Sequence, residues 1–153
     1  MLGVDPGRRR VGLALSDGAD GSIALPLATL DRPPDDREAA AKVRGLLGDI
    51  PVAEVVVGLP LRLDGTEGEA ARRARRFGDA LAHALLVPVS YMDERLTTVQ
   101  AERALGETGV RGQARRRVVD QAAATLILQC WLDRRAYRGA APTERRWDDE
   151  DEP

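Results

Sequence analysis

Short apolar runs, separated by residues that favour turns, occupy the first part of the chain. They cover residues 2–4, 11–17 and 22–30. The links between them contain glycine and proline, which favour tight turns. Pro26 lies inside the third run and is expected to interrupt it. Three such strands in succession predict an antiparallel meander.

From residue 35 onward, helical and extended patterns alternate. Helices are expected over residues 35–47, 67–85, 97–107 and 115–135, and strands over residues 54–58 and 87–92. The strand at 54–58 is apolar at nearly every position, which is typical of a parallel strand covered on both faces. We therefore predict an α/β fold: a mixed five-stranded sheet, with three antiparallel strands followed by parallel ones, flanked by helices on both faces.

The composition indicates one domain of cytoplasmic type. The chain has 153 residues, and only 3% of them are aromatic, so aliphatic side chains must build the core. Cys130 is the only cysteine and His83 the only histidine. A disulfide framework is therefore excluded, a structural zinc site is disfavoured, and a reducing compartment is expected.

Neither end of the chain suggests a membrane protein. No stretch reaches the roughly 20 apolar residues that a membrane-spanning helix needs, and the first residues lack the layout of a signal peptide.

Residues 139–153 are rich in charge and poor in apolar side chains. We expect one domain over residues 1–138, followed by an acidic, disordered tail over residues 139–153.

The charge is divided unevenly along the chain. The net charge of −2 includes five acidic residues in a row at 148–152, which hide a basic surplus in the rest. Lys42 is the only lysine, so nearly all basic residues are arginines, which suit bidentate phosphate contacts. A GC-rich genome would give the same bias. The arginines cluster at residues 72–76 and 111–117, which predicts either a phosphate-binding patch or a solvated helix face.

Three carboxylates lie in or beside apolar segments, where a charge is costly unless something pairs with it. Asp5 ends the first strand, Glu94 follows the strand at 87–92, and Asp120 lies in the last helix. Asp120 shares a helix face with small and apolar residues, so we expect it to point toward the sheet. Asp5 and Glu94 both stand at carboxyl ends of strands, where sites in such sheets gather. If the three meet, their repulsion requires a divalent cation, and oxygen ligands suit Mg²⁺ or Mn²⁺.

Each of these residues also has a purely structural interpretation. Asp5-Pro6-Gly7 is common turn chemistry, and a turn is expected there. Glu94 could belong to a strand-to-helix loop with solvated charges, in which Asp93 holds Arg95 or caps the following helix. Asp120 could pair with Arg116 or Arg117 in the preceding turn.

Four motifs, in this order, resemble those of the YqgF family, also called RuvX. They are Asp5-Pro6-Gly7 leading to Gly12-Leu13-Ala14-Leu15-Ser16-Asp17, Gly58-Leu59-Pro60 with Asp64-Gly65-Thr66, Asp93-Glu94-Arg95-Leu96-Thr97-Thr98, and Val119-Asp120-Gln121-Ala122-Ala123. The resemblance covers residues 2 to about 133. It implies an RNase H-like fold, and a nuclease site whose acidic residues match Asp5, Glu94 and Asp120. It also implies processing of the 5′ end of precursor 16S rRNA and, in some members, cleavage of branched DNA.

The chain departs from the family pattern beside these motifs. Arg8-Arg9 follows Gly7 where Thr-Lys is usual, and Arg62-Leu63 stands where Asn-Met is usual. Both changes are expected to alter contacts with substrate. The first strand is short, and we expect that the start was placed late or that the chain was trimmed.

The resulting hypothesis is a metal-dependent endonuclease with a two-metal site of Mg²⁺ or Mn²⁺, carried by the three carboxylates. Nucleic acid is the expected partner, contacted by Arg8, Arg9, Arg72, Arg73, Arg95 and Arg116. The alternatives are a Holliday junction resolvase and a non-catalytic RNA-binding factor of ribosome assembly. Nucleotide binding, as in actin-like ATPases and sugar kinases, would need a second domain. The apolar surface of the last helix makes a homodimer possible.

Overall fold

The computed structural model describes residues 1–17, 21–96 and 112–140. The helix expected at 97–107 and the tail from residue 141 lie outside the described residues. Among the helices of the described part, none is long and apolar enough to cross a membrane.

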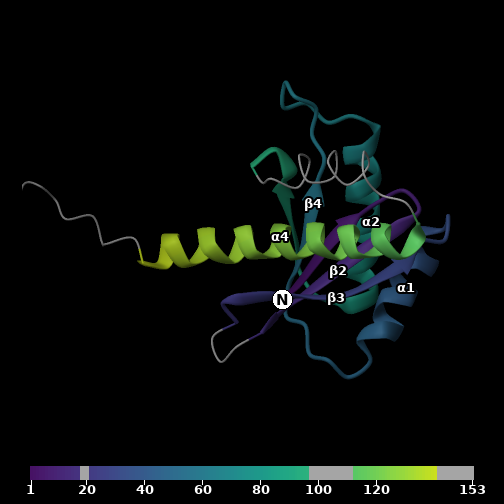
Figure 1. Ribbon diagram of the computed structural model, residues 1–153, viewed down its shortest axis with the longest axis horizontal. Helices are drawn as coiled ribbons and strands as arrows, with labels where there is room; N and C mark the ends of the chain where they lie inside the picture. Colours follow the sequence, from purple (N-terminus) through teal and green to yellow (C-terminus); the bar gives the residue numbers. More distant parts are fainter. Residues whose placement is uncertain (18–20, 97–111, 141–153) are drawn as a thin grey trace, which may run out of the picture.

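A single five-stranded sheet organises the protein, in the order β3-β2-β1-β4-β5 (Figure 1). Strands β1 (Leu2–Pro6), β2 (Arg10–Asp17) and β3 (Ile23–Asp31) pair antiparallel. Strands β4 (Val55–Leu59) and β5 (Val89–Asp93) run parallel to β1. The predicted mixed sheet of antiparallel and then parallel strands is therefore confirmed.

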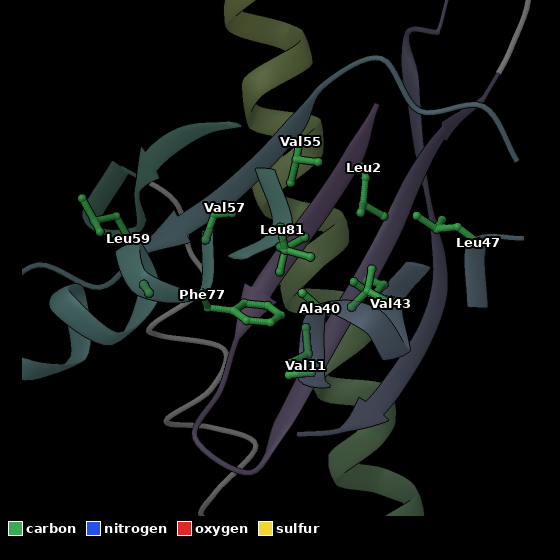
Figure 2. Close-up of a cluster of buried hydrophobic side chains, with 14 of the residues drawn as sticks. Leu2, Val11, Ala40, Val43, Leu47, Val55, Val57, Leu59, Phe77 and Leu81 are labelled. Atoms are coloured by element: carbon green, nitrogen blue, oxygen red, sulfur yellow. The ribbon is translucent and has the colours of Figure 1, made fainter. Parts of the chain in front are cut away.

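Helices α1 (Asp36–Leu47) and α2 (Glu69–Leu85) cover one face of the sheet. Figure 2 shows the apolar cluster between them and the strands, with the Phe77 ring at its centre. Phe77 and Leu81 of α2 are fully buried, as is Val43 of α1. Aliphatic side chains alternate toward this face along β1, β2 and β4, and among the described residues Phe77 is the one aromatic side chain that is fully buried in this cluster.

Helix α4 (Gln113–Ala140) covers the opposite face and lies across several strands (Figure 1). Its contact surface is made of small and aliphatic residues: Ala123, Ala124, Ile127, Leu128 and Leu132. Glycine on the facing strand brings the helix close. A Cβ added to Gly3 would lie 2.6 Å from the Cβ of Leu128. The helix can therefore approach the strand backbone itself.

Three local expectations differ from the structure. The predicted turn at Asp5-Pro6-Gly7 is wrong in its first two residues, because β1 continues through Pro6, which is paired with Val11. The parallel pairing of β1 with β4 ends at Val4, so the missing N–H of Pro6 costs no hydrogen bond to β4. Pro26 does not interrupt β3; the register shifts there, and the edge strand continues. Helix α4 extends to Ala140, beyond its predicted end at residue 135.

Candidate active site

Asp5 lies at the carboxyl end of β1 and is only 1% exposed. Its register partner on β2 is Gly12. Side chains alternate along a strand, so Asp5 faces the same side as Gly3, which is the side covered by α4. The first predicted carboxylate therefore lies under α4 and not in solvent.

The backbone of Asp120 in α4 lies over the same face of the sheet as Asp5. A Cβ added to Gly12 would lie 2.0 Å from the backbone oxygen of Asp120. Gly12 thus lets α4 sit directly on β2, beside Asp5 in the neighbouring strand. The expectation that Asp120 points toward the sheet agrees with this position.

The side chain of Asp120 is held by an arginine from β2. The Nε of Arg10 donates to Oδ2 of Asp120 at 2.7 Å, and both side chains are partly buried. The expected partners, Arg116 and Arg117, do not match this arrangement. Arg117 instead pairs with Asp31 at 2.7 Å. A partner 110 residues away replaced the one expected in the preceding turn.

Glu94 follows β5 and is 1% exposed. A Cβ added to Gly58 of β4 would lie 2.7 Å from its Oε1 and 2.6 Å from Cδ1 of Ile127. Glu94 therefore lies between β4 and α4, on the same face as Asp5. Burial, and secondarily the charge of Asp93, raises the pKa of Glu94 to about 7.

Asp93, the neighbouring acid, has a different role. Both of its oxygens accept from Arg95, with the Nη2 to Oδ2 distance at 2.7 Å. These hydrogen bonds lower the pKa of Asp93 below its usual range. Arg95 also donates to the backbone oxygen of Leu63 at 3.3 Å. The structural interpretation of Asp93 is confirmed, and Arg95 links the end of β5 to the loop after β4.

The three carboxylates share one face but do not form a ready ligand set. Within residues 1–17, 21–96 and 112–140, no group of three or more acidic, histidine or cysteine side chains is placed to hold a metal ion. Asp120 is turned to Arg10. The donor chemistry nevertheless fits a hard divalent cation, because Asp5, Glu94 and Asp120 offer only oxygen. Gly12 and Gly58 keep space where any side chain would fill it.

A basic hollow adjoins Asp120. Its volume is about 280 Å³, and its lining residues are Gly7, Arg8, Arg9, Arg10, Arg116 and Asp120. Arg8, Arg9 and Arg116, which the sequence suggested as nucleic-acid contacts, therefore lie around one space. We call this space the arginine hollow.

The turn that carries Arg8 and Arg9 is anchored by Arg32. The Nη1 of Arg32 donates to the backbone oxygen of Gly7 at 2.7 Å, and its Nη2 to Asp36 at 3.0 Å. Its guanidinium also lies 4.6 Å from the centre of the Phe77 ring. The position of the arginine hollow is thus fixed to the core beneath α1 and α2.

The arginines of α2 are arranged differently. Arg72 donates to Glu69, and its neighbours in the cluster pair with Glu67 and Glu69. Arg73 lies half-buried on the same helix. Helix α2 covers the face opposite α4, so Arg72 and Arg73 do not line the arginine hollow. The interpretation as a solvated helix face describes Arg72 well.

The sequence motifs include Gly12 and Gly58, but the close approach of each to its neighbour was not predicted, and neither was the role of Arg10. The two glycines had a recognisable signal, because an isolated glycine inside an apolar strand often marks a close backbone approach. Arg10 had none, since its partner is set by the packing of α4 on β2.

The sheet order and strand directions define an RNase H-like fold, and comparison with known proteins agrees. A family model described as "RuvX: Holliday junction resolvase" matches residues 1–134. The chain therefore belongs to the RuvX family of nucleases.

Similar proteins share most of its length. A protein of Nocardioides sp. (strain ATCC BAA-499 / JS614), named "Putative pre-16S rRNA nuclease", is 47% identical over 146 residues, covering 94% of this chain and 93% of the relative. One of the same name from Thermobifida fusca (strain YX) is 49% identical over 140 residues, covering 86% of each chain.

A solved structure shares the fold. It is described as "T. thermophilus RuvC in complex with Holliday junction substrate" and superposes with a TM-score of 0.53 at 16% identity. It covers 89% of this chain and 96% of that one. At this identity the likeness concerns the fold alone.

Proposed function

We propose that this protein is a metal-dependent endonuclease that cleaves phosphodiester bonds in the 5′ leader of precursor 16S rRNA. The observation that carries the proposal is that Asp5, Glu94 and Asp120 lie on one face of the sheet, with Asp120 at the edge of the arginine hollow. The names of the relatives support the choice of substrate.

Asp5, Glu94 and Asp120 would hold Mg²⁺ or Mn²⁺. When bound, such cations supply Lewis acidity that stabilises charge on the attacking and leaving oxygens of an in-line displacement. Burial raises the pKa of Glu94 to about 7, and a nearby positive charge would favour its ionised form. Asp5 lies under α4, which shields its side chain from bulk water.

The arginine hollow would bind the phosphates that flank the scissile bond. Arginine presents a planar fork of donors to phosphate oxygens, and such contacts position a nucleic acid without reading its sequence. Gly7 lines the hollow, and its missing side chain makes room for the backbone oxygen of Arg10, which would lie 2.4 Å from an added Cβ. Arg72 and Arg95 would make more distant contacts once nucleic acid competes for their present carboxylate partners. Arg73 would contact nucleic acid from the same helix as Arg72.

Cleavage of branched DNA is the second candidate. The description of the matching family model favours it. A resolvase cuts two strands, so this candidate goes with a homodimer. An apolar groove of about 390 Å³ between β3 and α4, lined by Pro26, Val118 and Leu126 among others, offers a surface for one. A non-catalytic RNA-binding factor is the third candidate, favoured by the Arg10–Asp120 ion pair.

A two-substrate cleavage assay separates these candidates. A precursor 16S rRNA leader and a four-way DNA junction are incubated with the protein in Mg²⁺, in Mn²⁺ and in EDTA. Asp120→Asn is compared with Asp133→Asn, the same chemical change at an exposed position of α4. The proposal predicts metal-dependent cleavage of the leader that Asp120→Asn loses and Asp133→Asn keeps. Cleavage of the junction alone favours the resolvase, and binding of the leader without cleavage favours the non-catalytic factor.

A further inference from the structure

The ion pair between Arg10 and Asp120 places a cationic side chain on a carboxylate that the proposed function assigns to a metal. The Nε of Arg10 contacts Oδ2 of Asp120 at 2.7 Å, with the two side chains 25% and 17% exposed. A divalent cation and the guanidinium of Arg10 would compete for this oxygen, because both draw on the same negative charge. Arg10 must therefore release Oδ2 before Asp120 can offer this oxygen to a cation.

The surroundings of Arg10 indicate what would draw it away. The arginine hollow places Arg8, Arg9 and Arg116 around the same space, and its lining contains one carboxylate, that of Asp120. Such a concentration of positive charge attracts an anion, and a backbone phosphate is the anion that the proposed function supplies. A phosphate in the hollow would offer Arg10 a second acceptor with more oxygens than Asp120 can provide.

We propose that Arg10 is a positioning residue that couples nucleic-acid binding to cation binding. In the free protein it holds Asp120. When a backbone phosphate enters the arginine hollow, Arg10 turns to the phosphate and leaves Asp120 to the cation. This inference rests on the proposed function and adds a binding order. Nucleic acid binds first and releases Asp120, and the cation then binds more tightly than it does to the free protein.

Such a coupling has two measurable consequences. Linkage is reciprocal, so the cation must tighten nucleic-acid binding by the same factor by which nucleic acid tightens cation binding. In addition, removing the charge of Arg10 must free Asp120 in the absence of nucleic acid. A residue that only supported the fold would weaken cation binding when removed, so the two roles predict opposite directions.

The first test is isothermal titration of Mn²⁺ into the free protein. Arg10→Gln is compared with wild type and with Arg9→Gln, which lines the same hollow. We expect Arg10→Gln to bind Mn²⁺ about tenfold more tightly than wild type, within the usual range of coupling between sites. Arg9→Gln should show a much smaller gain. Equal or weaker binding by Arg10→Gln, with an unchanged circular dichroism spectrum, overturns the proposal.

The second test measures the coupling itself. The affinity for a short fluorescent RNA without the leader's cleavage site is measured by anisotropy, in Mn²⁺ and in EDTA. The ratio of the two affinities should be well above one for wild type, and close to one for Arg10→Gln and Asp120→Asn. A ratio for Arg10→Gln equal to that of wild type overturns the coupling. Since this RNA is not cleaved, the result is independent of nuclease activity, which the two-substrate assay decides separately.

Discussion

Gly12 of β2 lies directly beneath the backbone of Asp120 in α4, so that even a Cβ at Gly12 would approach the carbonyl oxygen of Asp120 to 2.0 Å. This approach sets the height of α4 above the sheet. It also places the backbone of Asp120 over the β2 residue that pairs with Asp5. The candidate site therefore depends on a residue that has no side chain.

Gly12→Ala should destabilise the protein. The obstructing atom belongs to the helix backbone and cannot rotate away, so α4 must shift. Overpacking of this kind costs about 1–3 kcal/mol in the free energy of unfolding, which urea denaturation measures. Gly45→Ala is the matched control, because Gly45 lies in α1 with nothing within 4 Å of an added Cβ. It should stabilise by about 0.5–1 kcal/mol, as alanine does in a helix. Equal effects of the two changes would contradict the close packing.

Glu94 should make stability fall as the pH rises. Its pKa is raised from 4.5 to about 7 in the folded protein, so between these values the folded state keeps a proton that the unfolded chain has released. The loss of stability starts near pH 4.5 and is complete somewhat above pH 7. At about 1.4 kcal/mol per pKa unit, the stability lost amounts to at most about 3.5 kcal/mol.

Glu94→Gln tests this pH dependence. The variant should gain stability over wild type between pH 5 and pH 8 in EDTA, since the amide has no proton to lose. Urea denaturation at both pH values gives the difference directly. If the difference in the free energy of unfolding between variant and wild type is the same at pH 5 and pH 8, burial does not raise the pKa of Glu94.

Asp93→Asn should loosen the loop after β4 with little loss of global stability. Asp93 orients Arg95, which donates to the backbone of Leu63. The pair is partly exposed, so its loss should cost no more than about 1 kcal/mol. Hydrogen exchange should become faster at Gly65 and Arg62, whose amides form the hydrogen bonds of this loop. Unchanged exchange there would mean that the loop is held without Arg95.

The architecture could be predicted because it depends on patterns that are local in the sequence. The valines at 55–57 indicate a strand buried on both faces, and the acids at 5 and 94 stand at the ends of apolar runs. The parallel pairing of β1, β4 and β5 then places those strand ends at the same edge. Such inferences need only the spacing of residues along the chain.

The arrangement around Asp120 could not be predicted in the same way. An arginine in the preceding turn is the usual partner for a helical acid, whereas the partner here comes from a strand 110 residues away. That choice follows from how closely α4 packs on Gly12, a tertiary property. Pro6 is a similar case, because it is tolerated in β1 only where pairing with β4 has ended.

The most direct test of the account is the single-turnover cleavage rate of the precursor 16S rRNA leader in Mn²⁺ for Asp5→Asn. Asp49→Asn, an equal change at an exposed position after α1, is the control. If Asp5 holds the catalytic cation, the rate should fall at least about a hundredfold, the scale on which loss of one charge-stabilising group acts, while the control keeps the wild-type rate. A rate for Asp5→Asn within about twofold of wild type would contradict a carboxylate-based nuclease site at this position.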